Sequence, residues 1–397
     1  MKYTDFSFIS KSAVRRLERA FQQSGLLNVA LSYETVHQGV ILPFLIGGRF
    51  DAMGGVERAD GSFVKSSVFD WRMHGDYKHN HPLESDCKVI FIASIHKCWG
   101  HVITDAIKRL WILNTEEYKN LKAAGYKLAY ISYPDIRGRE FAYIHRVLQL
   151  CGIDISEMIY VASPTRFKEV IVPDSCYIQY HDFDCCTKEF VDIIERMKSK
   201  IVINQAFPTA EKIYLTRTRY NSKKDYGEEH VESLFRDKGY TVVSPENLCV
   251  DSQIYLISNA KFIASTEGSI SHSMIFADKD CECTVLRKAD YLNKYQILIA
   301  NVFLERFKYI DANLSVYTTH KHKEDGPFCL YITKNLLRYL HSDLRHTHPI
   351  LSKTFWRYLI KHNPLMLHLR NFRTFVFAPM TVKRVIIKNK LHFIKYR

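Results

Sequence analysis

The pattern of apolar residues between Cys87 and Phe307 constrains the fold of this chain more than any other feature. Short apolar runs, rich in β-branched residues and bounded by Pro, Gly, Ser or Asp, alternate there with amphipathic segments. Continuously apolar runs are typical of strands buried on both faces of a parallel sheet. The β-α-β-α order therefore predicts parallel sheets with helices on both faces. The strands are expected to begin near Lys88, Lys127, Glu157, Glu169, Lys212, Tyr240, Lys261 and Cys283.

The amphipathic segments between these runs are expected to be helical, over residues 99–113, 138–150, 187–200, 228–238, 251–259, 268–277 and 291–307. A chain of 397 residues exceeds the length at which one core usually stops growing, so two domains are expected. The pattern restarts after a proline-containing connection at residues 199–212. We predict two doubly wound domains, over residues 1–205 and 206–310, followed by a separate segment over residues 311–397. Their active site is expected in the cleft between the two domains, beyond the carboxyl ends of the strands.

Cysteine usage and the apolar runs indicate where the protein works. The ten cysteines are scattered, and no pair has the C-x-x-C spacing of a zinc site or a redox centre. The first 21 residues, MKYTDFSFISKSAVRRLERAF, lack the apolar core of a signal peptide. The run VILPFLI, from Val40, contains a proline and is too short to span a bilayer. We therefore expect reduced thiols, a cytoplasmic location and no transmembrane helix.

The net charge of +14 is concentrated at the end of the chain. After Asp343 there is no acidic residue, and lysines and arginines alternate there with aromatic and aliphatic residues. Three interpretations are open: attachment to an anionic membrane surface, a packed helical subdomain with a basic outer face, and binding to nucleic acid. We favour the first, so the segment 311–397 is expected to be a basic helical tail that binds the inner face of the membrane.

The motif GHVITDAIKR follows the first of the predicted strands. Gly100 precedes His101, Asp105 and Arg109, which are spaced i, i+4 and i+8 and would share one face of a helix. One interpretation is an amphipathic helix with a solvated network of charges. The other places His101 near the helix start, oriented by Asp105, where it could accept a proton from an attacking hydroxyl.

Two further motifs also follow predicted strands. Arg217 and Arg219 come directly after the strand KIYLT, and guanidinium groups in this place suit a diphosphate, although a basic surface loop would look the same. In the stretch STEGSISHSMIF, Gly268 allows a tight turn, and Ser269 and His272 would share a face of the helix that follows. Helix capping explains the hydroxyl groups of this stretch but neither Glu267 nor His272.

Together these motifs resemble glycosyltransferase family 61. The resemblance lies in the G-H-x-x-x-D-x-x-x-R motif from Gly100, the R-x-R motif from Arg217, and the stretch GYTVVSPENLCVDSQIYLISNAKFIASTEGSISHSMIF, which contains Glu246. It implies a GT-B architecture of two Rossmann-like domains. It also implies inverting transfer of a sugar from a nucleoside diphosphate-sugar, a UDP-sugar first of all, to a hydroxyl of a growing surface polysaccharide or lipid-linked glycan. Bacterial relatives of this kind are associated with capsular polysaccharide synthesis.

The resemblance also implies roles for the motif residues. Those expected to bind the donor are Arg217, Arg219, Glu246, Gly268, Ser269 and His272. His101 and Asp105 would face the acceptor, with Gly100 and Arg109 on the same side. Many members have a histidine in the turn where this chain has Glu267, so Glu267, Asp105 and His101 all remain candidates for the catalytic base.

No metal or other cofactor is expected, because arginines can carry the charge of the leaving diphosphate. The D-x-D tripeptide of Asp182 and Asp184 resembles the metal motif of GT-A transferases, but such tripeptides arise readily by chance. No nucleic-acid partner is expected. The alternatives are a pyruvyl or phosphosugar transferase on a similar frame, and a non-catalytic protein that binds membrane or nucleic acid.

Overall fold

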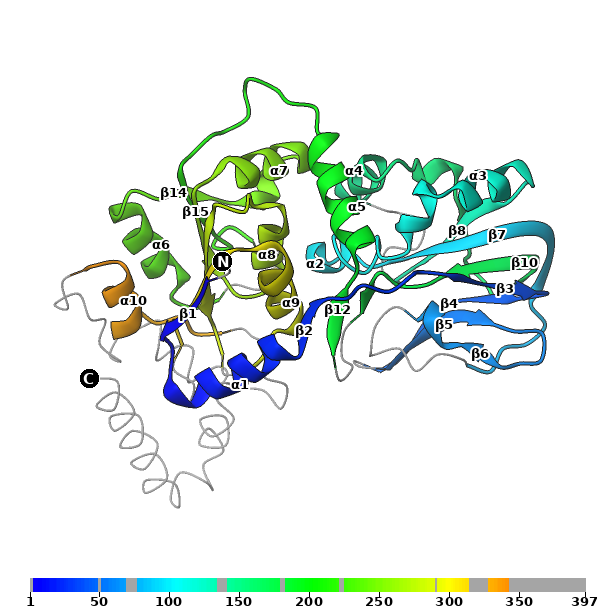
Figure 1. Ribbon diagram of the computed structural model, residues 1–397, viewed down its shortest axis with the longest axis horizontal. Coiled ribbons are helices and arrows are strands. Elements are labelled where there is room, and N and C mark those ends of the chain that lie inside the picture. The colour runs from blue at the N-terminus through cyan, green and yellow to red at the C-terminus, as the bar shows by residue number, and fades with distance from the viewer. Residues whose placement is uncertain are drawn as a thin grey trace, which may run out of the picture.

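The computed structural model describes residues 3–48, 51–68, 77–133, 141–178, 183–220, 225–289, 291–313 and 328–342. These residues form two units, one around a six-stranded sheet and the other around an eight-stranded sheet, which lie next to each other (Figure 1). The expected basic tail lies outside the described residues from residue 343 onward. Within the described ranges, no helix is long and apolar enough to cross a membrane.

The six-stranded sheet is parallel throughout, as the continuous apolar runs predict. Its strand order is β1 (Tyr3–Phe8), β17 (Arg306–Asp311), β16 (Glu282–Arg287), β15 (Phe262–Thr266), β13 (Lys212–Leu215) and β14 (Thr241–Val243). Successive residues of β15 contribute to different cores, because Ile263 belongs to one apolar cluster and Ala264 to another.

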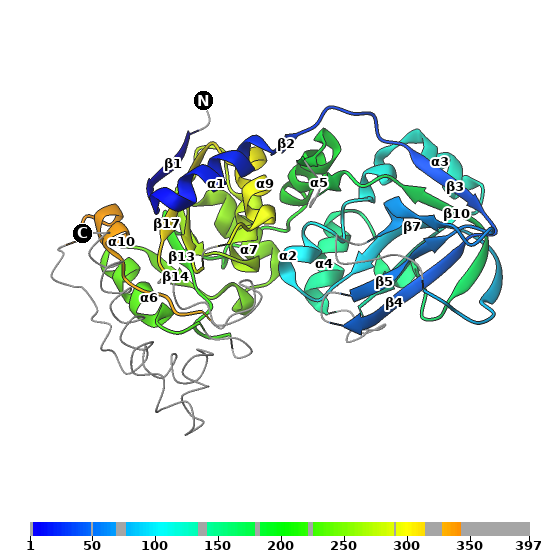
Figure 2. The ribbon, with the colours of Figure 1, turned by 90° about the horizontal axis from the view of Figure 1, so that it is seen from below.

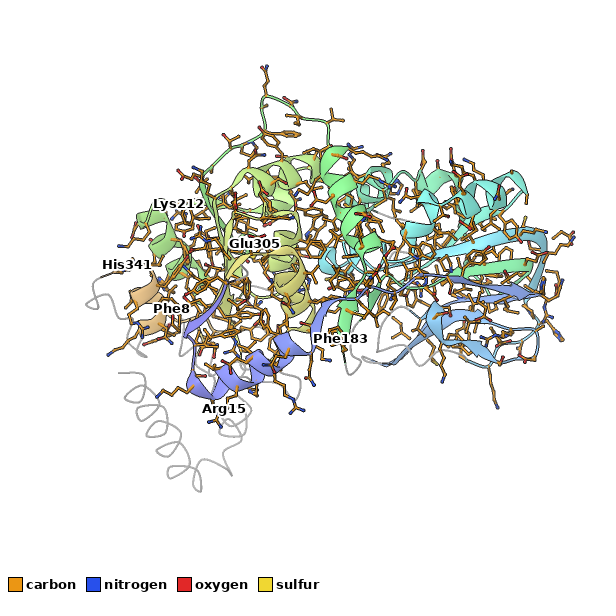
Figure 3. The ribbon with its side chains drawn as sticks, in the orientation of Figure 1. Phe8, Arg15, Phe183, Lys212, Glu305 and His341 are labelled. Atoms are coloured by element: carbon orange, nitrogen blue, oxygen red, sulfur yellow. The ribbon has the colours of Figure 1, made fainter. Side chains whose placement is uncertain are left out.

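Helices cover both faces of the six-stranded sheet. The face of Ile263 packs against α1 (Lys11–Gln22), α7 (Val250–Asn259) and α9 (Lys294–Phe303). The opposite face packs against α6 (Glu228–Asp237) and α10 (Lys334–Tyr339). Phe8, at the end of β1, lies edge-on against Tyr339 of α10 with ring centroids 5.6 Å apart. Figure 3 labels Phe8 next to α10. The expected doubly wound arrangement is therefore confirmed for this sheet.

The eight-stranded sheet is mixed. Its parallel part contains β10 (Thr165–Pro173), β7 (Leu83–Ile95), β8 (Lys127–Ser132) and β9 (Ile159–Tyr160). Its antiparallel part contains β3 (Tyr33–His37), β4 (Val40–Gly48), β5 (Asp51–Glu57) and β6 (Phe63–Val64). A third, small sheet joins β11 (Tyr177–Ile178), β12 (Asp184–Cys186) and β2 (Ser24–Leu26).

The expectation of helices on both faces is wrong for the eight-stranded sheet. One face packs against α4 (Ala142–Leu150) and α5 (Lys188–Ser199), and α3 (Glu116–Ala123) packs against the same core through partly buried residues only. The core on the other face joins Val89 and Phe91 of β7 to apolar residues of the antiparallel strands, such as Phe44 and Val56. The strands before residue 65 thus cover the surface that a second helical layer would need.

The two units are joined by shared apolar packing and by ion pairs. One core cluster contains Ile92 of β7 as well as Ile263 of β15. The guanidinium of Arg146 in α4 donates two hydrogen bonds of 2.6 Å to the carboxylate of Asp251 in α7. The same carboxylate accepts a hydrogen bond of 2.8 Å from the amide of Val202. Both views show α4 and α7 at the boundary between the units (Figures 1 and 2).

The first strand belongs to the six-stranded unit. β1 pairs in parallel with β17, with Tyr3 opposite Arg306. The division of the chain at residue 205 stays a prediction, but residues 3–22, which form β1 and α1, lie on the second unit rather than the first. Local patterns do not show such a pairing, because its partners are about 300 residues apart in the sequence.

The ion pair between Arg146 and Asp251 should contribute to stability. We expect Arg146→Ala to lower the free energy of unfolding by about 2 kcal/mol, because it leaves a nine-tenths buried carboxylate without its bidentate partner. The measurement is urea unfolding followed by circular dichroism. Arg166→Ala is the matched control, since Arg166 contacts the exposed Glu84 at 3.5 Å and its loss should cost about 0.5 kcal/mol or less. Equal effects of the two substitutions would contradict the prediction.

Candidate active site

The carboxyl ends of β7 and β15 meet where the two units join. The chain leaves β7 for the short helix α2 (Trp99–Val102), and it leaves β15 for the short helix α8 (Ser269–His272). The two helices touch: Cys98 Sγ lies 2.9 Å from Ser269 Oγ, and Trp99 Nε1 donates to Ser273 Oγ at 2.8 Å. Figure 2 shows α2 at the boundary between the units. Two of the three sequence motifs thus come together at one place.

The predicted helix over residues 99–113 is wrong. The α-helix ends at Val102, and a 3-10 helix forms only later, over Leu110–Asn114. Between them the amide of Ala106 donates to the carbonyl of His101, five residues earlier, and the Thr104 hydroxyl donates to the Gly100 carbonyl. Such a side-chain bond to the backbone competes with regular helix geometry. The segment therefore turns instead of continuing as a straight helix.

His101 and Asp105 nevertheless form the predicted pair. His101 Nδ1 lies 2.7 Å from Asp105 Oδ2, which also accepts from the hydroxyl of Tyr295 at 2.9 Å. Burial alone would raise the pKa of Asp105, but the hydrogen bond from His101, the nearby Lys108 ammonium and the Tyr295 hydroxyl hold it below its usual value. Asp105 is thus an anion at neutral pH.

The ionised carboxylate fixes the tautomer of His101. Because Asp105 can only accept, Nδ1 of the neutral imidazole carries the proton, and Nε2 carries the lone pair. The His101 side chain is 19% exposed, whereas that of Asp105 is 4% exposed. A buried carboxylate that orients a partly exposed imidazole is the arrangement of a general base.

Gly100 allows the two units to approach each other. A Cβ atom on Gly100 would lie 2.4 Å from Nδ1 of His272 and 3.3 Å from Oγ of Ser269. The first distance is shorter than any van der Waals contact, so a side chain at this position would push α2 away from α8.

His272 is buried against this contact as a neutral imidazole. Asn293 uses its carbonyl oxygen to accept from the amide of Gln296, so its Nδ2 faces His272 Nε2 at 3.4 Å. Burial and the nearby His101 lower the pKa of His272 to about 3. The ring stacks on Tyr295, with centroids 5.5 Å apart, and in the described part of the chain its Nδ1 has no hydrogen-bond partner.

Glu267 follows β15 in the six-stranded unit and directly precedes the turn at Gly268. It is 1% exposed, and burial raises its pKa to about 7 against the opposing effect of Arg287 and Lys288. Among the described residues its Oε2 has no hydrogen-bond partner. The following Gly268 has a φ of 132°, which side chains rarely tolerate, so glycine is required for the turn.

The residues predicted to bind the sugar donor differ in their solvent exposure. Arg217 is half-buried after β13, with its guanidinium 5.4 Å from the ring centre of Tyr220, and its amide donates to Glu228 Oε1 at 3.1 Å. Burial raises the pKa of Glu228 to about 7. Arg219 and Glu246 are exposed. The structure therefore brings Gly100, His101, Asp105, Ser269 and His272 together, while the donor-binding role of the two arginines and Glu246 stays a prediction.

Arg109 does not share a helix face with His101, contrary to the predicted alignment. It is fully buried, and its Nη2 donates to the backbone carbonyls of Ser66 and Val68. Its guanidinium lies 5.6 Å from the ring centre of Phe91, and burial lowers its pKa to about 10. Arg109 thus links the segment after β6 to the eight-stranded sheet. Its predicted role on the acceptor side stays a prediction.

In the D-x-D tripeptide of Asp182 and Asp184, the described aspartate forms an ion pair with a lysine. Asp184 forms an ion pair with Lys294 at 3.2 Å, and Asp182 lies outside the described residues. In the ranges that the structure describes, no group of three or more His, Cys, Asp or Glu side chains is placed to hold a metal ion. Metal-independent chemistry stays a prediction.

Several residues of this junction lie outside the motifs of the sequence. Cys98, Asn293 and Tyr295 contact the motif residues directly, yet no motif contains them. Tyr295 falls at the beginning of a predicted helix, where only its tertiary contacts distinguish it from a core aromatic residue. Burial alone would raise the pKa of the Cys98 thiol, but the nearby His101 imidazole, the Ser269 hydroxyl and the amides at the start of α2 together hold it below its usual value.

The close approach at Gly100 gives a direct test of the junction. We expect Gly100→Ala to lower the free energy of unfolding by about 1–3 kcal/mol, because the new methyl group overlaps His272. Gly25→Ala is the control, since a Cβ there would meet its nearest neighbour, Phe183, at an ordinary 3.7 Å. Urea unfolding of both variants measures the difference. A Gly100→Ala protein as stable as the control would contradict the geometry of this contact.

Comparison with curated proteins finds no match for the chain. Residues 99–285 match the sequence model of the family described as Glycosyltransferase 61. The matched segment contains α2, β13, β15 and α8, and with them every motif residue of the junction. The part of the chain that joins the two units is therefore similar to glycosyltransferase family 61, and this similarity supports glycosyltransferase activity.

Proposed function

We propose that the protein is an inverting glycosyltransferase that transfers a sugar from a nucleoside diphosphate-sugar, with a UDP-sugar as first candidate. The acceptor is a hydroxyl of a surface polysaccharide or of a lipid-linked glycan. The observation that carries the proposal is the pair of His101 and Asp105 at the contact of the two units, inside the segment that matches the family. The two units would then act as the two halves of a GT-B enzyme.

In the proposed reaction His101 is the base. Its Nε2 takes the proton of the acceptor hydroxyl, and the oxygen attacks the anomeric carbon on the face opposite the leaving group. The bond from that carbon to the diphosphate oxygen breaks, and its electron pair leaves with the diphosphate. Asp105 stabilises the imidazolium that forms. In this proposal Arg217 and Arg219 stabilise the negative charge on the leaving diphosphate, without a metal ion.

Glu267 is the second candidate for the base. A pKa of about 7 suits a general base at neutral pH. Its 1% exposure counts against it, because a substrate could reach the carboxylate only after the surrounding residues move. His101 is partly exposed in the arrangement described, so we assign the base to His101.

Substitution of the two candidates tests this assignment. We expect His101→Ala to lower the rate of transfer by about 100-fold or more, because the proton acceptor is lost. Glu267→Gln should retain transfer within about tenfold. The measurement is donor hydrolysis and transfer over a panel of UDP-, GDP- and CMP-sugars.

The melting temperature with each nucleotide serves as the binding control, since a bound nucleotide stabilises the folded protein. His101→Ala should keep the shift that the wild type shows. If no nucleotide raises the melting temperature of the wild type, the proposed donor class is wrong. If Glu267→Gln loses transfer and His101→Ala keeps it, the base is Glu267.

We also propose that the protein binds the inner face of the membrane through the basic segment that follows residue 343. Its support is the sequence alone, in which lysines and arginines alternate with aromatic residues. Such a placement would bring the enzyme to a lipid-linked acceptor.

Removal of the basic segment tests this proposal. A protein that ends at Ser352 should lose most of its binding to anionic vesicles, because each Lys or Arg near the surface contributes roughly 1 kcal/mol. Its donor hydrolysis should remain measurable. Co-sedimentation with vesicles that contain phosphatidylserine, and with neutral vesicles as the control, measures the change. Unchanged sedimentation with the anionic vesicles would exclude the segment as the anchor.

A further inference from the structure

Tyr295 connects the six-stranded unit to the pair of His101 and Asp105. It is the second residue of α9, the helix between β16 and β17, and is 6% exposed. Its hydroxyl donates to Asp105 Oδ2 at 2.9 Å, across 190 residues of sequence. We propose that Tyr295 is a positioning residue that orients Asp105 and thereby sets the proton affinity of His101. The inference rests on the proposed function, in which His101 is the base.

The ring of Tyr295 is fixed by its neighbours. It lies edge-on to His101, with centroids 5.3 Å apart and an interplanar angle of 87°. It also stacks on His272 at 5.5 Å and 24°, and on Tyr177 at 6.1 Å and 28°. Three aromatic contacts leave the ring little freedom to turn away, so the direction of the hydroxyl toward Asp105 is set by packing.

The hydroxyl of Tyr295 shares its acceptor atom with His101. Asp105 Oδ2 accepts from both, whereas the single hydroxyl proton of Thr104 is directed to the Gly100 carbonyl at 2.8 Å. A carboxylate oxygen offers about two lone-pair directions, so the two donors divide its charge. Without the Tyr295 hydroxyl, more of that charge faces His101, and the imidazolium form becomes more stable.

Other titratable groups surround the pair but belong to different contacts. Lys108 lies 3.7 Å from the other carboxylate oxygen, Oδ1. The ring of His96 lies 5.0 Å from that of His101, and its Nδ1 accepts from the amide of Cys98. His272 stays neutral because its pKa is near 3. The Cys98 thiol also interacts with His101, and the buried Arg109 guanidinium interacts with Asp105. Replacement of Tyr295 by phenylalanine keeps all of these groups, so a change in the titration of His101 would report the lost hydroxyl.

The hydrogen bond from Tyr295 also makes the hydrogen bonding of Asp105 depend on the relative position of the two units. The contacts of Cys98 with Ser269 and of Trp99 with Ser273 hold α2 near α8, but neither reaches the carboxylate. Tyr295, on α9 of the six-stranded unit, donates its hydrogen bond to Asp105 itself. A displacement of α9 would therefore change the hydrogen bonding of Asp105 directly.

Kinetics of Tyr295→Phe test the inference. We expect kcat to fall about tenfold with an unchanged KM for the donor, because a hydrogen bond to a charged group is lost away from the donor. The acid limb of the kcat/KM profile should move to higher pH, because a more stable imidazolium loses its proton at higher pH. Tyr240→Phe is the control: its hydroxyl lies 3.5 Å from that of Tyr339, and it should leave kcat and the pH profile unchanged.

A titration that needs no substrate provides the second measurement. Nuclear magnetic resonance of protein labelled at its histidines, with the signal of His101 assigned by its absence in His101→Gln, follows the imidazole directly. The midpoint of His101 should rise in Tyr295→Phe. If Tyr295→Phe does not fold, Tyr295→Leu removes the same hydroxyl and should also raise the midpoint.

The outcomes separate the inference from the proposed function. An unchanged His101 midpoint in a folded Tyr295→Phe protein, or an unchanged pH profile, overturns the positioning role. If the wild type turns over no nucleotide-sugar, the proposed function is overturned, while the titration still decides whether Tyr295 sets the proton affinity of His101. A raised midpoint together with the shifted acid limb supports both.

Discussion

The close contact between α2 and α8 determines how the two sheets can be arranged. Backbone from one unit meets side chains from the other at Gly100, where no Cβ atom would fit against His272. This contact fixes the place of the residues that follow on each side. The ring of Tyr295, stacked on His272, then reaches the carboxylate of Asp105. Because Gly100 has no side chain, the two units can approach closely enough for a network of hydrogen bonds and ring contacts to join them.

The segment after β7 shows how a local irregularity can serve a site. A straight helix over residues 99–113 would have placed Arg109 on the face of His101. Instead the chain turns after Val102, and Arg109 is buried against backbone carbonyls elsewhere. The turn keeps the hydrogen bond between His101 and Asp105 and buries the carboxylate beneath it. Low exposure of Asp105 strengthens its interaction with the imidazole, because little water screens it.

Much of the fold can be predicted from the sequence, because burial determines the spacing of apolar residues along strands and helices. Each predicted strand is present, since continuous apolar runs reflect strands covered on both faces. The antiparallel strands before residue 65 precede the segment that has this pattern, so the pattern does not predict them. In the site, spacing was enough to predict the pair of His101 and Asp105. The contribution of Tyr295 was not predictable, because a contact across 190 residues leaves no local signal in one sequence.

The pairing of β1 with β17 means that the six-stranded unit is not a continuous piece of the chain, because the other unit lies between β1 and β13 in the sequence. The polypeptide starts in the six-stranded sheet, crosses to the other unit, and returns near residue 212. As the chain is synthesised, β1 emerges first, yet its partner strand is complete only at Asp311. Until then the first strand has no neighbour in its sheet, and the other unit can collapse before it. The edge of the six-stranded sheet formed by β1 is therefore completed only after β17.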